Sequence, residues 1–376
     1  MRIIKIVKTK VFILATIPLL ILLSGCGEFK DIDKMVFVSM IGVDQSEDPE
    51  KPYKIILKLY VPTSSFRQNP TPEYSYLIKE GATLAETISL LEAYIDKELD
   101  FGHSRLIVVG EKMLQDQKNE VILDFLIRRP DIQMISYFTV GRPNAEEIVK
   151  FTPAGETALQ PTLFNYFDNN GAESSYIVTT FLFDFRRRIK EEGINPILPI
   201  VEMNEPKTHF IVNKSIVLAE DKPPYELDPE KTLLVKLLSN EAKNLIFDVD
   251  RGGENFVARL DTVKTKYDVD AGKDGKVSIK VEIKLAGMIT ESKKNLSNKE
   301  LPRYNKLLTE EMKEKVTAFI QELQTEGYDP IGFGLQLNSH TLPKNRMSEN
   351  EWLSAFKNAD VEVSVKVGLK STGSIE

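Results

Sequence analysis

The sequence has 376 residues, of which 42% are hydrophobic and 28% charged, with a formal net charge of −7. These fractions are ordinary for a globular protein, and the acidic balance argues against a nucleic-acid partner, because phosphates repel an acidic surface. A single cysteine in the whole chain excludes an intramolecular disulfide framework.

The N-terminus has the features of a secretory signal peptide. Four basic residues and no acidic one stand at its start, and a nearly unbroken apolar run of 13 residues follows, up to Leu23. A membrane-spanning helix needs about 20 such residues, so the run fits the hydrophobic region of a cleaved signal peptide better. Leu23, Ser24, Gly25 and Cys26 then have the pattern of a lipobox. We therefore predict a signal peptide over residues 1–25.

Cys26 is the predicted site of lipid attachment, through an S-diacylglyceryl group with or without N-acylation. Two acyl chains hold a protein stably at a membrane, because each buried methylene contributes about 0.8 kcal/mol. Cleavage removes four of the 49 basic residues, which leaves 45 against 56 acidic residues and a net charge of −11. Anionic lipid repels such a surface, so the lipid and not a basic patch is expected to be the anchor. The alternative is that Cys26 belongs to an uncleaved anchor.

The first part of the exported chain alternates strands with helices. Strands are expected from Met35 to Asp44 and over 55–61, separated by a polar loop. A capping box at Thr83, with apolar residues at helical spacing behind it, predicts a helix from Thr83 to near Leu99. The remaining expected elements are a strand over 106–109, the end of a helix over 121–127, a strand over 134–140 and a helix capped by Asn144. This alternation predicts an α/β arrangement.

A connection is expected at residues 193–199, where two prolines within four residues interrupt both helix and strand. We place a domain boundary near residue 200 on this ground. The predicted organisation is an N-terminal α/β part over 26–200 and a C-terminal α+β part over 201–376.

The second part contains the clearest strand of the sequence, over 277–285, where apolar and polar residues alternate strictly. Apolar residues from Leu308 to Leu323 lie on one stripe and predict a long helix, which Gly327 would end. A final strand is expected over 361–367. The overall prediction is a multidomain protein of mixed α/β and α+β class, with antiparallel strands around a long helix in the second part.

Catalytic and metal-binding motifs are missing from the sequence. The three histidines are His103, His209 and His340, and none has a second histidine or cysteine at metal-ligand spacing. There is no G-x-S-x-G elbow, H-E-x-x-H motif, phosphate-binding loop or dinucleotide fingerprint. We therefore expect a protein that is not an enzyme and that carries no metal or cofactor.

Several short motifs occur together in a fixed order. They are M-I-G-V-D at Met40–Asp44, F-G-H-S-R-L-I-V-V-G at Phe101–Gly110, R-R-P-D-I at Arg128–Ile132, D-P-I-G-F-G at Asp329–Gly334, then Trp352, Phe356 and the closing valine strand. In this order and behind a lipobox, the chain resembles the Ger(x)C family over nearly its whole length. These are the lipoprotein C subunits of nutrient germinant receptors in endospore-forming bacteria.

The resemblance implies a multidomain α/β subunit without known enzymatic activity. Such a subunit acts with two integral membrane proteins, the A and B subunits, at the outer face of the spore inner membrane, where nutrients trigger the complex. The chain departs from the family pattern after the lipid cysteine, where Phe29 replaces a tryptophan that usually follows directly. It departs again at Asn213–Ser215, where members often have a glycine-containing strand.

Seven residues of these motifs are candidate functional positions, each with a structural alternative. His103 is either a switch or interface residue that titrates near neutrality, or a turn histidine. Arg128 either pairs with a partner subunit or offsets a helix dipole. Trp352 with Phe356 either anchors an interface or forms a core pair on one helical face. Gly332 and Gly334 permit a tight backbone path. The full set is Gly42, Asp44, His103, Arg128, Gly332, Gly334 and Trp352.

The preferred function from the sequence is an assembly or signalling subunit of a membrane receptor. The alternative is a solute-binding lipoprotein of a transporter, in which two lobes close on a ligand, and a lipid-anchored hydrolase is third.

Overall fold

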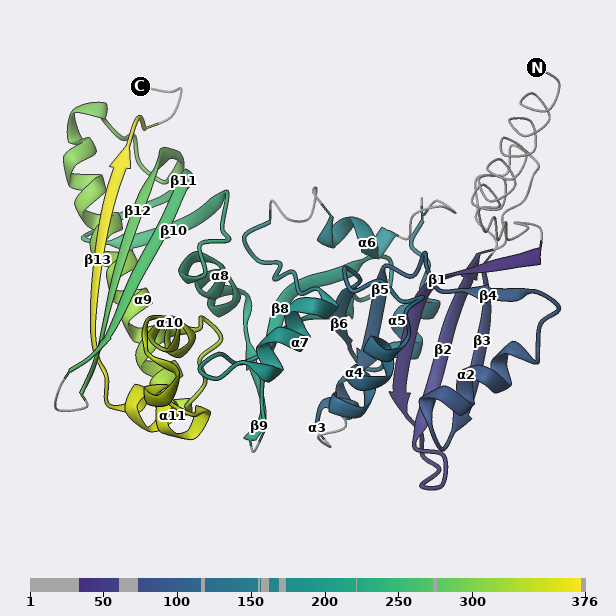
Figure 1. Ribbon diagram of the computed structural model, residues 1–376. Helices are drawn as coiled ribbons and strands as arrows, with labels where there is room; N and C mark the ends of the chain where they lie inside the picture. Colours follow the sequence, from purple (N-terminus) through teal and green to yellow (C-terminus); the bar gives the residue numbers. More distant parts are fainter. Residues whose placement is uncertain are drawn as a thin grey trace, which may run out of the picture.

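The structure is a computed structural model that describes residues 34–60, 74–115, 119–154, 156, 162–168, 174–220, 222–272 and 276–372. The predicted signal peptide and Cys26 therefore lie outside the described residues. Within the described residues the chain forms two β-sheets with helices packed on them (Figure 1).

The first sheet has nine strands and occupies the centre and right of Figure 1. Its order is β3-β2-β1-β5-β6-β7-β8-β9, with β4 beside the start of β1. The four central strands β1, β5, β6 and β7 run parallel, and the hairpin partners on both sides are antiparallel. The strands are β1 (Met35–Gln45), β2 (Tyr53–Tyr60), β3 (Tyr74–Gly81), β4 (Glu98–Asp100), β5 (Leu106–Gly110), β6 (Tyr137–Gly141), β7 (Ile197–Met203), β8 (Phe210–Ala219) and β9 (Lys222–Leu227).

Helices cover both faces of this sheet, because its central strands are apolar on both sides. One buried cluster joins one strand face to α2 (Leu84–Glu92), α3 (Glu111–Gln115), α4 (Asn119–Arg128) and α7 (Leu182–Lys190). A second cluster joins the opposite face to α5 (Ala145–Lys150) and α6 (Thr162–Phe167). The first part is thus a three-layer α/β arrangement.

The second sheet lies at the left of Figure 1 and has the order β10-β11-β12-β13. Its strands are β10 (Leu245–Arg251), β11 (Glu254–Ala271), β12 (Val277–Ser292) and β13 (Asp360–Leu369). The first three are antiparallel, whereas β13 returns parallel to β12 after a helical crossover. That crossover contains α9 (Leu301–Glu326), α10 (Phe333–His340) and α11 (Glu349–Lys357), with short 3₁₀ turns at Asn298–Glu300 and Pro343–Asn345.

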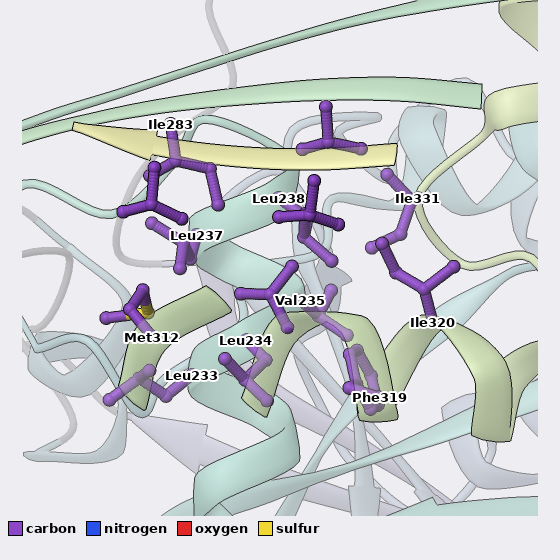
Figure 2. Close-up of a cluster of buried hydrophobic side chains, with 14 of the residues drawn as sticks. Leu233, Leu234, Val235, Leu237, Leu238, Ile283, Met312, Phe319, Ile320 and Ile331 are labelled. Atoms are coloured by element: carbon purple, nitrogen blue, oxygen red, sulfur yellow. The ribbon is translucent and has the colours of Figure 1, made fainter. Parts of the chain in front are cut away.

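The core of the second part is built on one face of this sheet. Figure 2 shows leucines of α8 (Pro229–Leu238) packed between α9 and the sheet, with Met312, Phe319 and Ile320 on α9 and Ile283 on β12. The other face of β12 is polar and exposed. The predicted fold class, mixed α/β and α+β with a long helix in the second part, is confirmed.

Two predicted boundaries differ from those in the structure. The helix from Thr83 ends at Glu92 and not near Leu99, because Glu98–Asp100 forms β4 against the start of β1. The strand predicted over 134–140 begins only at Tyr137. In each case pairing with a distant strand decides where the element begins or ends, so the boundary cannot be predicted from local periodicity.

The prediction that Pro196 and Pro199 interrupt both helix and strand is wrong at Pro199, which lies inside β7. β7 pairs with β6 only at Ile200 and Val201, after the proline, so the missing N–H of Pro199 does not break that ladder. The first sheet then continues through β9 to Leu227. The domain boundary near residue 200 stays a prediction.

Candidate functional site

The D-P-I-G-F-G motif surrounds a carboxylate with no solvent exposure, that of Asp329. Its oxygens accept hydrogen bonds from the N–H groups of Gly332 at 2.8 Å and Gly334 at 3.0 Å, and from Nε1 of Trp352 at 3.1 Å. Burial raises the pKa of Asp329 to about 6, against the lowering effect of the backbone donors. The aspartate therefore fixes the turn before α10 and holds α11 through its tryptophan.

The same turn docks on the loop between α7 and β7. The side-chain oxygen of Asn195 accepts the N–H of Asp329 at 2.6 Å, and the Asn195 N–H donates to the Asp329 carbonyl at 2.8 Å. The N–H of Leu335 donates to the Gly193 carbonyl at 2.8 Å. These reciprocal bonds join the segment that enters the first sheet to the helices of the second sheet. We call the combination of Arg188 and Glu192–Asn195 with Asp329–Leu335, Glu349 and Trp352 the joint.

Two charged residues complete the joint. Glu349, at the start of α11, accepts from the Gly193 N–H at 2.7 Å and from Nδ2 of Asn195 at 3.1 Å. Arg188 of α7, which is 8% exposed, donates to the carbonyl of Pro330 at 3.0 Å and is paired with Asp184 at 2.8 Å. Burial also raises the pKa of Glu349. The contacts are polar and directional, and that of Arg188 is buried while those of Glu349 are partly buried, which makes the joint specific in geometry.

Two glycines are required at the joint by close backbone approach. Gly193 has a φ of 81°, in the left-handed region, and a Cβ there would collide with the backbone of Gly334. A Cβ on Gly334 would lie 2.6 Å from the indole ring of Trp352. Side chains larger than hydrogen therefore cannot be accommodated at these positions without separating the two segments.

The joint predicts a pH dependence of stability. Between about pH 4 and pH 6 the folded chain holds a proton on Asp329 that the unfolded chain has lost, since its pKa there is near 3.8. The contribution of Asp329 to the free energy of unfolding is therefore fully present below about pH 4. It falls by up to about 3 kcal/mol as the pH rises to about 6. Urea unfolding from pH 4 to 7 should show this fall relative to Asp329→Asn, whose side chain does not titrate. Parallel pH profiles for both proteins would contradict the prediction.

The structure places the seven candidate residues in separate locations. Gly332, Gly334 and Trp352 meet at the joint, and Trp352 is fully buried and stacked on Phe356 at 5.3 Å between ring centroids. His103 has a 66% exposed side chain that lies on Phe37, 4.5 Å between centroids. The side chain of Arg128 is 80% exposed at the end of α4, 3.7 Å from Asp124. Gly42 packs under α5, where a Cβ would lie 3.1 Å from Val149.

Asp44 has a structural contact that its motif did not reveal. Its carboxylate accepts the N–H groups of Ala145 at 2.7 Å and Glu146 at 2.8 Å, at the start of α5. Burial raises the pKa of Asp44. A distant side chain thus satisfies the free N–H groups of a helix that Asn144 also caps.

Replacing Asp44 by alanine is expected to lower the free energy of unfolding by about 1–2 kcal/mol, because one buried and one partly buried N–H group lose their acceptor. Asp44→Asn keeps one acceptor oxygen and should lose less. Chemical denaturation of the three proteins measures the order. Equal stabilities of Asp44→Ala and the wild type would refute this assignment.

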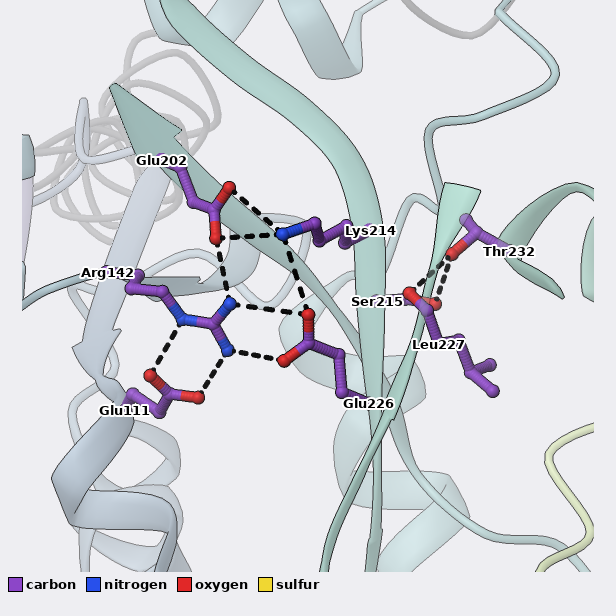
Figure 3. A network of polar contacts seen from close by, with 8 residues as sticks. All are labelled: Glu111, Arg142, Glu202, Lys214, Ser215, Glu226, Leu227 and Thr232. Atoms are coloured by element: carbon purple, nitrogen blue, oxygen red, sulfur yellow. Dashed lines mark hydrogen bonds and ion pairs between the residues drawn. The ribbon is translucent and has the colours of Figure 1, made fainter. Parts of the chain in front are cut away.

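A network around Arg142 was not predicted from the sequence. Arg142, directly after β6, contacts Glu111 at 2.5 Å, Glu202 at 2.8 Å and Glu226 at 2.8 Å, and Lys214 lies beside the last two (Figure 3). The carboxylates, Glu111 first, raise the pKa of Arg142. These residues come from α3, from the position after β6 and from the three strands β7, β8 and β9, so no local pattern could indicate them. The network ties strand ends together and contains no nucleophile with an adjacent base.

The residues that the sequence missed at the joint are Arg188, Gly193, Asn195 and Glu349. The signal for Gly193 and Asn195 was the G-I-N-P stretch, which the sequence indicated only as a connection, whereas no local pattern marked Arg188 or Glu349. In the described part of the chain no group of His, Cys, Asp or Glu is placed to hold a metal ion. No helix among the described residues is long and apolar enough to span a membrane.

Two protein-family models match the chain in succession. The model described as the spore germination protein N-terminal domain matches residues 28–203, and the model described as spore germination B3/GerAC like, C-terminal, matches residues 213–373. Among curated relatives, the putative spore germination protein YfkR of Bacillus subtilis (strain 168) is 24% identical, over 95% of this chain and 96% of the relative. The spore germination protein GerQC of Bacillus cereus is 22% identical, over 95% and 97%.

The fold is similar to that in the crystal structure of the GerBC protein, with a TM-score of 0.55 and 16% sequence identity. That likeness covers 88% of this chain and 96% of the other. Because the two family models span nearly the whole described chain in order, the resemblance seen in the sequence is confirmed: the chain belongs to the Ger(x)C family of spore germination proteins.

Proposed function

We propose that this chain is a non-enzymatic lipoprotein subunit of a nutrient germinant receptor. It is held at the outer face of the spore inner membrane by lipid on Cys26 and acts there with the integral membrane A and B subunits. The observation that carries the proposal is the match of both halves of the chain to spore germination family models, behind a lipobox. The polar contacts of the joint and of the Arg142 network hold segments of the fold together, and neither places a serine, threonine or cysteine beside a histidine.

Affinity purification from detergent-solubilised spore membranes tests the assembly. Tagged full-length protein is expected to recover two polytopic membrane proteins, and Cys26→Ala should recover less of both. Recovery of a permease with an ATPase would favour the solute-binding alternative, and recovery of neither would remove the receptor proposal. Calorimetry against candidate nutrients separates the two functions independently, because a solute-binding protein binds its ligand alone.

Deletion tests the functional role. A strain that lacks this protein and other receptors with the same nutrient response should no longer germinate with that nutrient. Germination should fail because the receptor is not assembled, and no measurable catalytic activity should be lost. Normal germination of the deletion strain would contradict the proposal.

We infer that the joint transmits the response between the two sheets, because its polar contacts connect the segment that enters the first sheet to the helices of the second. Movement of one packed part of a protein against another is a common way of switching. The backbone N–H of Glu349 donates to the carboxylate of Glu192, so the two residues are neighbours across the joint. Glu192→Cys combined with Glu349→Cys should form a disulfide that blocks the nutrient response until it is reduced. Unchanged germination of the crosslinked double variant, with each single variant as control, would refute this role.

A further inference from the structure

Two exposed apolar side chains lie side by side where β6 and α7 begin, those of Ile135, which is 59% exposed, and Phe183, which is 45% exposed. The N–H of Phe183 donates to the carbonyl of Met134 at 3.0 Å, and Tyr137 forms an antiparallel bridge with Phe181. Ile135 therefore stands opposite Phe183, two positions along the same pair of segments. The ring of Phe181 stacks on that of Phe183 at 5.5 Å between centroids. We call Ile135, Phe181 and Phe183 the apolar edge.

The apolar edge continues a buried aromatic cluster on one face of the first sheet. The rings of Tyr137 and Phe181 stack at 4.9 Å between centroids. Tyr137 also contacts Phe164 and Phe167 of α6, each at 5.4 Å. Aromatic contacts thus lead from the core out to the solvent. Exposed apolar side chains that lie together, unlike single ones, indicate an interaction surface.

This surface lies near the place where the chain enters the first sheet. The ring of Phe37, close to the start of β1, lies 4.5 Å from that of His103. The carbonyl of Gly102 accepts a hydrogen bond from Nε2 of Gln133 at 2.7 Å, two residues before Ile135. Because β1, β5 and β6 run parallel, all three strands begin on this side of the sheet. The start of β1 and the apolar edge therefore share one side of the first sheet.

The predicted lipid is attached shortly before β1. Residues 27–33 separate Cys26 from Lys34, the first described residue, and a chain of this length spans at most about 29 Å. We propose that the apolar edge docks on the lipid bilayer, with Ile135 and Phe183 in its interfacial region. The docking rests on the proposed lipidation of Cys26. The anchor brings this side of the sheet to the membrane, and the burial of two apolar side chains then fixes the orientation of the protein.

The free charges beside the apolar edge are basic. Arg105, directly before β5, and Arg186, on α7, are exposed, and neither pairs with an acidic side chain among the described residues. Arg186 is three residues from Phe183, so both lie on one side of the helix, and Asp184 is already paired with Arg187. The mature chain is acidic overall, so anionic headgroups favour the orientation that turns these arginines toward them. The nearness of the anchor favours lipid over a partner protein as the occupant.

Fluorescence quenching by lipid tests the docking in the full-length lipoprotein. Ile135→Cys and Phe183→Cys each provide one thiol for an environment-sensitive dye, because lipid occupies the sulfur of Cys26. Glu47→Cys is the matched control, since Glu47 is exposed just beyond the opposite end of β1. In vesicles of phosphatidylethanolamine and phosphatidylglycerol, spin-labelled lipid should quench the dye at positions 135 and 183 and leave the dye at position 47 unquenched.

A charge placed on the apolar edge tests what its side chains contribute. With the dye at position 135, Phe183→Glu should lower the ratio of docked to undocked protein by about tenfold, because the apolar burial of the ring is lost. Ile246→Glu is the control, since Ile246 is 54% exposed on β10 of the second sheet. It should leave the quenching at position 135 unchanged, and an equal effect of both variants would contradict the docking.

Vesicle flotation and mass spectrometry of Cys26 separate this docking from the lipoprotein proposal. Equal quenching at the three positions, or none at 135 and 183 in lipid-bearing protein that floats with the vesicles, would overturn the docking alone. A dye at position 135 that is shielded in spore membranes but not in protein-free vesicles would show that a partner protein covers the apolar edge, and would overturn the docking too. Protein without lipid on Cys26 would overturn both proposals.

Discussion

Replacing Trp352 by alanine is expected to lower the free energy of unfolding by about 3–5 kcal/mol, one of the largest effects of a single substitution in this chain. The indole is fully buried, stacks on Phe356 and donates Nε1–H to Asp329. Alanine leaves a cavity between α11 and the D-P-I-G-F-G turn and removes one donor from a buried carboxylate. Urea denaturation of the full chain measures the loss.

Trp352→Phe separates packing from the hydrogen bond. Phenylalanine keeps most of the ring contact with Phe356 but provides no donor to Asp329, so a loss of about 1–3 kcal/mol is expected. If Trp352→Phe were as unstable as Trp352→Ala, the hydrogen bond and not the cavity would dominate. Wild-type stability of Trp352→Ala would show that the joint does not contribute to folding.

Breaking the ion pair between Lys58 and Glu156 is expected to cost a similar amount, about 3–5 kcal/mol. Lys58 on β2 is 1% exposed and Glu156 is 3% exposed, and Nζ lies 2.7 Å from Oε1. The ammonium also lies 4.0 Å from the centre of the Tyr74 ring, and the other carboxylate oxygen accepts the N–H of Thr162. Burial lowers the pKa of Lys58. Lys58→Met therefore leaves Glu156 buried without its cation.

A double-mutant cycle distinguishes loss of the pair from loss of packing. Lys58→Met should be more damaging than Lys58→Met/Glu156→Gln, because the double variant removes both charges and buries no lone ion. The measurement is the unfolding free energy of the wild type, the two single variants and the double variant. Additive losses would mean that the pair has no net coupling and would contradict the argument.

The organisation of the fold could largely be predicted from local patterns. Alternation gave the strand over 277–285, and the capping residue Asn144 and the stop at Gly327 lie where the structure begins α5 and ends α9. Each of these signals depends on residues within one or two turns of chain. The boundaries that failed, near Leu99 and at Pro199, depend on pairing with strands far away in the sequence.

Some residues of the joint could likewise be predicted from the sequence, and others could not. D-P-I-G-F-G and Trp352 were recognisable as family motifs, but their sequence neighbours say nothing of Asn195, which is 134 residues from Asp329. The Arg142 network was even less predictable from the sequence, because Glu202 and Glu226 lie 60 and 84 residues from the arginine. Their carboxylates alone look like ordinary solvated charges.

The sequence by itself determined the predicted lipid anchor, the absence of an intramolecular disulfide, the fold class and the resemblance to the Ger(x)C family, since these follow from composition and contiguous motifs. Only the tertiary structure decided which motif residues share a site. It brought Gly332, Gly334 and Trp352 to the joint and left His103 and Arg128 exposed elsewhere. The physical reason is that a buried carboxylate needs several donors at once, and folding supplies them from segments that are separate in the chain.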